Sequence, residues 1–331
     1  MKEVYFYQQL ANKKVQCGIC PHRCIVAEDG FGVCKVRENI DGKLYARNYG
    51  QYAALALDPI EKKPLYHFYP GATILSIGAL GCNFTCEFCQ NWELARATAA
   101  TKAISSRRLV ELATTAAIEG CIGIAYTYSE PLMWYEFVFD TAQLARERGL
   151  KNVLVSNGYI EPEPLAKLLP YLDAVNIDVK AFQSEFYRRL CGARLEPVLN
   201  TVEKCVRAGC HVELTTLLIP GWNDSGAEIG QLVAWVASLD PAIPLHFSRY
   251  FPHHKFTLPP TPLKTLRLAW ELAKEKLAYV YLGNVEAGEG SHTYCPACGQ
   301  EVIRRYGYQV EISEMTGNCC RSCGEKLAIY L

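Results

Sequence analysis

The sequence has almost no net charge, because its 331 residues include 34 lysines and arginines against 34 aspartates and glutamates. The chain therefore lacks the long-range field that attracts nucleic acid or acidic lipid, and we do not expect it to bind a polyanion. It also lacks long apolar runs: ATILSIGAL at 72–80 is far shorter than the roughly 20 residues of a membrane helix, and the first ten residues contain no apolar signal core. These absences predict a cytoplasmic protein that does not enter a membrane.

The residues between 72 and 284 alternate short β-branched runs with helical patterns, within a chain that is 50% hydrophobic and 21% charged. Strands are predicted at 72–78, 121–126, 151–156, 173–179, 211–219, 244–250 and 279–283. Helices are predicted at 105–119, 131–148, 162–169, 183–190, 196–209, 225–238 and 262–277. Apolar strands joined by amphipathic helices form parallel sheets, so this pattern predicts an α/β fold with a partial (β/α)6-type barrel.

The 16 cysteines are concentrated in three short stretches of the chain. Clustering of this kind, without a secretory signal, indicates metal binding rather than a disulfide framework. We predict a cysteine-rich module at 1–70 with a β segment at 43–57, the barrel at 71–284, and a second module at 285–331. The remaining single thiols are predicted to be inert core residues: Cys121, Cys191, Cys205 and Cys210.

The central stretch, ALGCNFTCEFCQNW, places Cys82, Cys86 and Cys89 directly after the first predicted strand, with C-x3-C-x2-C spacing. Four thiolates normally hold a 4Fe-4S cluster. Three thiolates in one loop can hold three irons and leave the fourth iron open to an exogenous ligand, as catalytic zinc sites keep an open position. The alternative is a zinc knuckle, although structural zinc prefers four ligands.

This triplet resembles the cluster loop of the radical S-adenosylmethionine (SAM) superfamily. The resemblance implies that the open iron chelates SAM, that one electron cleaves SAM, and that a 5′-deoxyadenosyl radical then abstracts a hydrogen atom. The aromatic residue before the last cysteine lies against the adenine in that family, which implies this role for Phe88.

The segment TYSEP (127–131) stands where the same family has Gly-Gly-Glu-Pro, which holds the SAM ammonium group. Here Tyr128 and Ser129 replace both glycines, while Glu130 matches the family's glutamate. The alternative is an ordinary helix start with Pro131 in its first turn. Because sites in βα barrels lie at the carboxyl ends of the strands, all of these loops are expected to converge on one face.

Further polar residues follow the next strands. Asn157 is expected either to hydrogen-bond SAM or to form a turn with Gly158. Asp178 and Lys180 point to one face of the fourth strand and resemble the D-x-K motif of glycyl-radical-enzyme activases, which lies beside SAM. Lys180 and His246 are the predicted catalytic residues, although a lone histidine is as often a satisfied core residue.

The C-terminal module contains CPACG and CRSCG, two C-x2-C-G knuckles around a predicted hairpin. The pattern predicts a zinc ribbon, with rubredoxin-like iron as the competing occupant, whose ligands are Cys295, Cys298, Cys320 and Cys323. Residues 295–331 contain equal numbers of basic and acidic residues, which disfavours nucleic acid as a partner there.

The N-terminal module contains CGICPHRC at 17–24 and a further cysteine in GFGVC. Its four thiols are Cys17, Cys20, Cys24 and Cys34. The spacing favours zinc held by all four thiolates; the alternatives are an auxiliary 4Fe-4S cluster and unligated thiols.

Along its whole length the sequence resembles the radical SAM proteins of the AmmeMemoRadiSam system, which are similar to pyruvate formate-lyase-activating enzyme. The resemblance implies Memo-type and AMMECR-type partners and a one-electron donor such as flavodoxin or ferredoxin. It implies a radical SAM enzyme with an unidentified substrate. The alternatives are a glycyl-radical-enzyme activase and a noncatalytic iron-sulfur and zinc scaffold.

Overall fold

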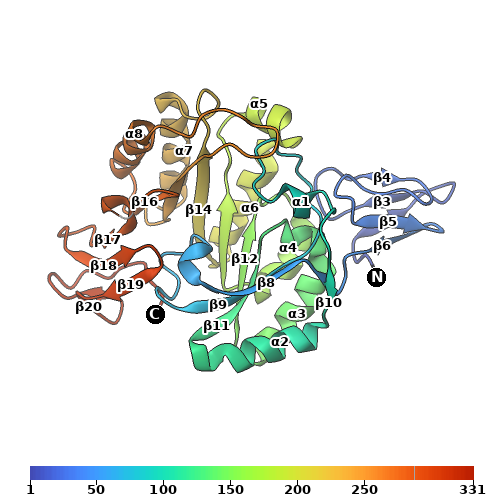
Figure 1. Cartoon of the computed structure of the whole chain (residues 1–331), viewed down its shortest axis with the longest axis horizontal. Coiled ribbons are helices and arrows are strands. Elements are labelled where there is room, and N and C mark those ends of the chain that lie inside the picture. The colour runs from blue at the N-terminus through green and yellow to red at the C-terminus, as the bar shows by residue number, and fades with distance from the viewer. Residues whose placement is uncertain (287) are drawn as a thin grey trace.

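The computed structural model describes residues 1–286 and 288–331 and is built around one eight-stranded sheet (Figure 1). Seven strands are parallel and lie in chain order: β9 (Thr73–Gly78), β11 (Cys121–Tyr126), β12 (Lys151–Ser156), β13 (Ala174–Asp178), β14 (His211–Leu218), β15 (Leu245–Arg249) and β16 (Val280–Gly283). The eighth, β8 (Ala54–Pro59), pairs antiparallel with β9. In the described part of the chain β8 and β16 are the unpaired edges, so the sheet is open and not a closed barrel. The seven predicted strands are confirmed with small shifts at their ends.

Helical segments form the connections between these strands, as predicted. They are α2 (Ser106–Thr115), η2 (Ala116–Glu119), η3 (Pro131–Trp134), α3 (Tyr135–Glu147), α4 (Pro162–Leu168), η4 (Leu169–Tyr171), α5 (Ser184–Phe186), η5 (Tyr187–Cys191), α6 (Leu195–Arg207), α7 (Gly226–Leu239) and α8 (Leu263–Lys274). Their ends follow the local chemistry: Ser105 caps α2 by accepting the Arg108 N–H, and Gly120 ends η2 in the left-handed region with φ 77°. None of the helices in the two described ranges is both long and apolar enough to cross a bilayer.

Two of the connections that differ from the predicted single helices lie beside the strand ends. The segment at 131–148 begins as the 3-10 turn η3, where Pro131 occupies the first turn and Glu130 caps it, before α3 continues. The segment at 183–190 becomes π-helical in η5 and ends at Gly192 in the left-handed region. Rare π-helical turns are frequent at functional sites, and η5 lies against the cysteine loop.

The N-terminal part forms two small antiparallel sheets beside the main sheet (Figure 1). Their strands are β1 (Lys2–Glu3), β5 (Arg37–Ile40) and β6 (Lys43–Ala46), and β2 (Tyr7–Gln9), β3 (Val15–Cys17) and β4 (Ile25–Val26). The predicted β segment at 43–57 is wrong as one element, because it comprises β6, β7 (Gln51–Tyr52) and part of β8. β7 pairs with β10 (Lys102–Ala103), η1 (Ile60–Lys62) follows β8, and α1 (Trp92–Ala95) follows the cysteine loop.

The C-terminal part packs on the opposite side of the main sheet from the N-terminal sheets (Figure 1). It contains η6 (Glu289–Ser291), β17 (Thr293–Tyr294), β18 (Glu301–Tyr306), β19 (Gln309–Ile312), β20 (Met315–Thr316) and β21 (Cys319–Cys320). The predicted hairpin between the two knuckles is confirmed as β18 and β19. Arg305 fixes this part to the rest of the chain, since its buried guanidinium donates to Thr293 Oγ1 and to the Tyr66 carbonyl.

Candidate functional site

A cavity of about 550 Å³ lies at the carboxyl ends of the parallel strands. This volume is in the range of sites for small molecules, about 300–1,000 Å³. The wall of this cavity contains nearly all of the residues that the sequence predicts for the central site. They are Cys82, Cys86, Phe88, Cys89, Ser129, Glu130, Asn157, Asp178 and Lys180. The expected convergence of the strand-end loops is therefore present.

The three central thiols lie on one loop that is held by neighbouring backbone. The Thr85 N–H donates to the Cys191 carbonyl at 2.8 Å, and the Phe84 N–H donates to Cys82 Sγ at 3.3 Å. Among the described residues, the sulfur atoms of Cys82, Cys86 and Cys89 do not all lie within 4.8 Å of one another. Ligands that share one zinc ion lie closer than that, whereas ligands of a 4Fe-4S cluster each bind a different iron. The loop thus fits a cluster better than a single ion.

Cys191 lies beside this loop, although the sequence predicts only an inert core thiol. Its side chain is fully buried, and its thiol hydrogen-bonds Cys86, which lowers the pKa of Cys86. The sequence hides this proximity, because Cys191 ends the π-helical turn η5, about a hundred residues after the triplet. The other single thiols fit the prediction better: Cys121 opens β11, Cys210 precedes β14, and Cys205 is buried in α6.

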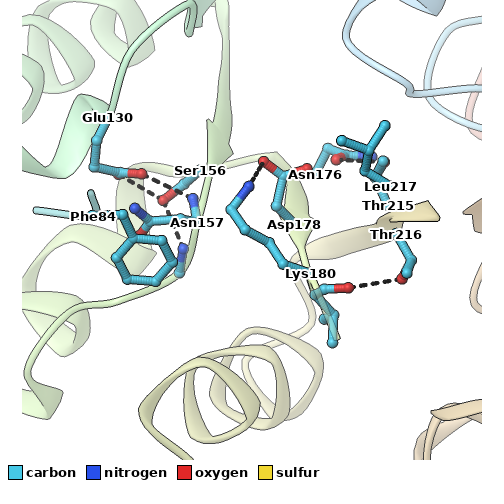
Figure 2. Close-up of polar contacts among 12 residues, drawn as sticks. Phe84, Glu130, Ser156, Asn157, Asn176, Asp178, Lys180, Thr215, Thr216 and Leu217 are labelled. Atoms are coloured by element: carbon cyan, nitrogen blue, oxygen red, sulfur yellow. Dashed lines mark hydrogen bonds and ion pairs between the residues drawn. The ribbon is translucent and has the colours of Figure 1, made fainter. Parts of the chain in front are cut away.

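Glu130 is a buried carboxylate with three hydrogen-bond donors (Figure 2). It accepts from the Leu132 N–H at 3.0 Å, from the Ser156 hydroxyl at 2.7 Å and from the Asn157 N–H at 2.8 Å. Burial raises the pKa of Glu130 to about 7, and these hydrogen bonds oppose the rise. The carboxylate is therefore fixed in orientation and has capacity left for one more donor from the cavity. Glu130 therefore both caps the helical turn that begins at Pro131 and lines the cavity, as the two interpretations of this segment predict.

Asn157 connects the carboxylate side of the cavity to the cysteine loop. Its side-chain Nδ2 donates to Asn83 Oδ1 at 2.8 Å and lies 3.8 Å from Cys82 Sγ, while its Oδ1 accepts the Tyr159 N–H at 2.9 Å. Gly158 follows with φ 69°, so the predicted turn is also confirmed.

Asp178 and Lys180 form an ion pair on the opposite side of the cavity, with 3.0 Å between Lys180 Nζ and Asp178 Oδ2 (Figure 2). Although burial opposes the charge, Asp178 holds the pKa of Lys180 well above its usual range, so the ammonium group persists at neutral pH. The backbone of Lys180 is fixed by the Tyr187 hydroxyl and by Asn223, whose side chain donates to the Lys180 carbonyl. The segment IPGWND, which contains Asn223, thus supports the wall from behind.

Tyr128 occupies the left-handed region with φ 69°, where the resemblance implies glycine. Its hydroxyl donates to Asp58 Oδ2 at 2.5 Å, and its carbonyl accepts from Asn91 Nδ2 at 2.7 Å. These contacts offset the strain of a non-glycine residue in this conformation. Ser129 donates to the Ala79 carbonyl at 2.6 Å, which ties this segment to the start of the cysteine loop.

Phe88 is buried, and its ring lies 5.8 Å from Phe186 and 6.1 Å from Phe256. Since it also lines the cavity, it presents an apolar surface beside the thiols.

His246 does not lie where the sequence predicts a catalytic residue, and it is not part of the cavity wall. Its Nε2 pairs with Glu213 Oε2 at 2.7 Å, and Glu213 also binds His211 Nε2 and the backbone N–H groups of Tyr66 and His67. Burial opposes the charge of Glu213, but the histidine contacts hold its pKa well below its usual range. His246 is thus a buried histidine with a hydrogen-bond partner, which is the alternative stated from the sequence, because a buried carboxylate requires such partners.

The cavity wall also contains residues that the sequence analysis missed, among them Lys63, Arg249 and Tyr308. Arg249 was within a strand-end segment, so its position could have been inferred. Lys63 and Tyr308 come from outside the main βα units, and no local pattern points to them. Lys63 pairs with Asp58 Oδ2 at 2.7 Å, in contact with the Tyr128 ring.

The four thiols of the C-terminal knuckles form a compact group, with all sulfur atoms within 4.8 Å of one another: Cys295, Cys298, Cys320 and Cys323. Two of the sulfur pairs are 3.6 and 3.7 Å apart. Tetrahedral zinc with Zn–S bonds of about 2.3 Å sets sulfur atoms about 3.8 Å apart, so these residues fit such an ion. Cys319 lies outside the group.

The Radical SAM superfamily model matches residues 77–233, which run from β9 into α7 and contain the cysteine loop and the ends of β11, β12 and β13. An uncharacterized protein of Methanocaldococcus jannaschii is 46% identical over 336 residues, which cover 100% of both chains.

Named relatives match over shorter stretches. The choline trimethylamine-lyase activating enzyme of Oleidesulfovibrio alaskensis is 24% identical over 57% of this chain and 56% of its own. The pyruvate formate-lyase 1-activating enzyme of Escherichia coli K12 is 26% identical over 44% of this chain and 60% of its own. The chain thus spans less than two thirds of either enzyme.

Among solved structures, Streptococcus suis SuiB bound to S-adenosylmethionine has a TM-score of 0.51 and 15% sequence identity, over 61% of this chain and 48% of SuiB. At this identity the similarity shows the fold alone.

Proposed function

Because this chain belongs to the radical SAM superfamily, we propose that it is an enzyme whose loop of Cys82, Cys86 and Cys89 holds a 4Fe-4S cluster beside bound SAM. When bound, the cluster supplies an electron, received from a donor such as flavodoxin or ferredoxin, for reductive cleavage of SAM to a 5′-deoxyadenosyl radical that abstracts hydrogen from an unidentified substrate. The observation that carries the proposal is the shared cavity of the three thiols, Glu130 and the Asp178–Lys180 pair.

The chain's own residues are proposed to bind and orient SAM. Glu130 offers a fixed acceptor for the SAM ammonium, with Ser129 and Asn157 beside it. Lys180, held by Asp178, presents a cation to the opposite wall and can stabilise an anionic group or move a proton there. Phe88 offers an apolar face for the adenine. These groups contribute mainly by positioning. We propose no contact between His246 and the reacting atoms.

Product analysis tests this proposal. The chain would be reconstituted with iron and sulfide without oxygen, reduced in the presence of SAM, and analysed by chromatography for 5′-deoxyadenosine. We expect this product and an altered electron paramagnetic resonance (EPR) spectrum of the reduced cluster on SAM addition. A spectrum that does not change with SAM, together with absence of the product, would instead support the noncatalytic scaffold.

A second candidate function is activation of a glycyl-radical enzyme, which the partial similarity to two activating enzymes favours. In that case the hydrogen atom comes from a backbone glycine of a large partner. A glycyl radical signal in a co-incubated partner would support this candidate. Formation of 5′-deoxyadenosine with transfer of its hydrogen from a small molecule would contradict it.

Membership in the AmmeMemoRadiSam system is part of the same proposal, with Memo-type and AMMECR-type proteins as partners and a cytoplasmic location. The support is the sequence resemblance along the chain, including CPHRC at its start and RRYGYQV near its end. In the structure, two of the four basic residues of residues 295–331 are engaged: Arg304 pairs with Glu301, and Arg305 is buried. Together with the equal numbers of acidic and basic residues there, this fits a structural or protein-docking use of that module.

Replacing Glu130 with glutamine is expected to weaken SAM binding about tenfold to a hundredfold, because a hydrogen bond to a charged group contributes about 1.5–3 kcal/mol. The NH2 group of the glutamine would also face the Leu132 and Asn157 N–H groups, which now donate to the carboxylate and orient it. Binding should be measured by anaerobic calorimetry, with the exposed Glu163→Gln on α4 as the matched control. For the native chain, affinity should fall as pH drops below about 7, since protonation of Glu130 removes its charge. Equal affinities of the two variants would contradict this role.

We also propose that the C-terminal thiols hold zinc. The expected result is one zinc per chain by mass spectrometry of the purified protein, lost when Cys298 and Cys323 are both replaced by serine. Because Cys295 and Cys320 of the knuckles lie in the small core of this module, loss of the metal should also lower the unfolding temperature of this module. Iron at the same sites, with a rubredoxin-type absorption spectrum, would contradict zinc.

A further inference from the structure

The four N-terminal thiols converge on a pocket of their own, separate from the central cavity. They come from β3, from the loop between β3 and β4, and from the turn before β5: Cys17, Cys20, Cys24 and Cys34. All four are free, three of them are buried, and Cys24 is half-buried. Four reduced thiols facing one pocket form a set of metal ligands and not a disulfide pair.

The spacing of these sulfur atoms separates the two metals that the sequence leaves open. A compact metal site has three or more ligand atoms that all lie within 4.8 Å of one another. Among the described residues, the C-terminal thiols are the one set that meets this distance. No three of the N-terminal thiols meet that distance. A tetrahedral zinc ion requires sulfur atoms about 3.8 Å apart, whereas a cubane binds each thiolate at a different corner and spreads them.

Much of the wall of this pocket is apolar. Gly32 lacks a side chain at the point where a Cβ would lie 3.8 Å from both Cys24 Sγ and Cys34 Sγ. Ile19, Val26 and Met133 also line the pocket, beside the polar side chains of His22, Arg37 and Asn83. A dry apolar wall suits an iron-sulfur cluster, whose potential depends on solvent exposure and on hydrogen bonds to its sulfur atoms.

One polar group in this wall has no partner. Arg37 is fully buried, and its two terminal nitrogens donate to the Glu136 carboxylate at 3.1 Å each. Its Nε has no acceptor in the described structure, although a buried N–H normally has one. Arg37 lines the thiol pocket, so a sulfur atom inside it would satisfy this donor.

From these observations we propose that Cys17, Cys20, Cys24 and Cys34 hold a second 4Fe-4S cluster, fully ligated by protein and hydrogen-bonded by Arg37. This site lies next to the central cysteine loop. A Cβ on Gly81 would be 2.7 Å from Val36 and 3.0 Å from the Cys34 carbonyl, and His22 Nε2 lies 2.8 Å from the Asn83 carbonyl. The N-terminal module is therefore a second redox centre beside the first.

Metal analysis of the full chain tests the proposal independently of SAM cleavage. A variant with Cys82, Cys86 and Cys89 all replaced by alanine keeps the N-terminal module intact. After anaerobic reconstitution it should retain about four irons and four sulfides per chain, half of the wild-type content. Its reduced form should give a cluster EPR signal that does not change when SAM is added, because no iron is open.

The complementary variant, Cys20→Ala with Cys24→Ala, should also lose about half of the iron and keep the SAM-sensitive signal. Cys210→Ala, which removes a half-buried thiol outside every proposed site, is the control and should lose none. Zinc in place of iron in the central triple variant, or a triple variant free of iron, would overturn the proposal. That variant decides the question even where the N-terminal variant fails to fold.

Discussion

Replacing Cys86 with alanine should abolish formation of 5′-deoxyadenosine and release most of the iron of the central site. The reason is geometric as well as chemical. Two thiolates remain on the loop, and the irons lose the anchor that sets them against Glu130 and Lys180 in the same cavity. Product chromatography and iron analysis measure the two effects, and Cys210→Ala serves as the control for loss of a thiol.

Cys191 can change the iron content that this experiment measures, because its thiol already contacts Cys86. In the Cys86→Ala chain it can capture an iron, so residual iron is expected to disappear in the Cys86→Ala, Cys191→Ala double variant. Cys191→Ala alone should keep both the cluster and the product. If instead the wild type does not respond to SAM and Cys191→Ala does, then Cys191 occupies the open iron and the proposed activity of the native chain is wrong.

Replacing Glu136 with glutamine is expected to destabilise the chain by about 3–5 kcal/mol, since it leaves the buried Arg37 cation without its counter-charge. The side chains of Arg37 and Glu136 are 2% and 0% exposed, and two hydrogen bonds of 3.1 Å join them. This pair connects β5 of the N-terminal part to α3 of the main fold. The free energy of unfolding by denaturant measures the loss.

The exposed Glu147→Gln on the same helix is the matched control and should have little effect. The double variant Arg37→Met, Glu136→Gln should recover part of the lost stability, because no unpaired charge remains buried. Equal stabilities of the Glu136 and Glu147 variants would show that the ion pair contributes nothing net.

Much of the main fold could be predicted because its signals are local. Each parallel strand is a short apolar run, and capping residues such as Ser105 and Gly120 mark the helix ends nearby in the sequence. Sites in βα folds lie at the carboxyl ends of the strands, so the motifs at 82–89, 127–131 and 178–180 could be assigned to one face without knowledge of the long-range contacts.

The errors concern positions that only tertiary packing decides. His246 lies on a strand with the predicted alternation, but its pairing with Glu213 depends on β14 and on the segment that contains His67. Cys191 approaches the triplet because η5 is a π-helical turn, which no local pattern indicates. The N-terminal spacing is compatible with zinc and with iron-sulfur, and only the separation of the sulfur atoms distinguishes them.

Tyr308 lies in the β18–β19 hairpin, yet its side chain lines the central cavity, as do Lys62 and Lys63 from the segment before β9. All three fall outside residues 77–233, the stretch shared with the superfamily. Part of the cavity wall thus comes from outside the stretch that the superfamily model matches. If the proposed function holds, exchanging that single hairpin tip would alter the shape offered to a substrate and leave the residues proposed to hold the cluster and SAM in place.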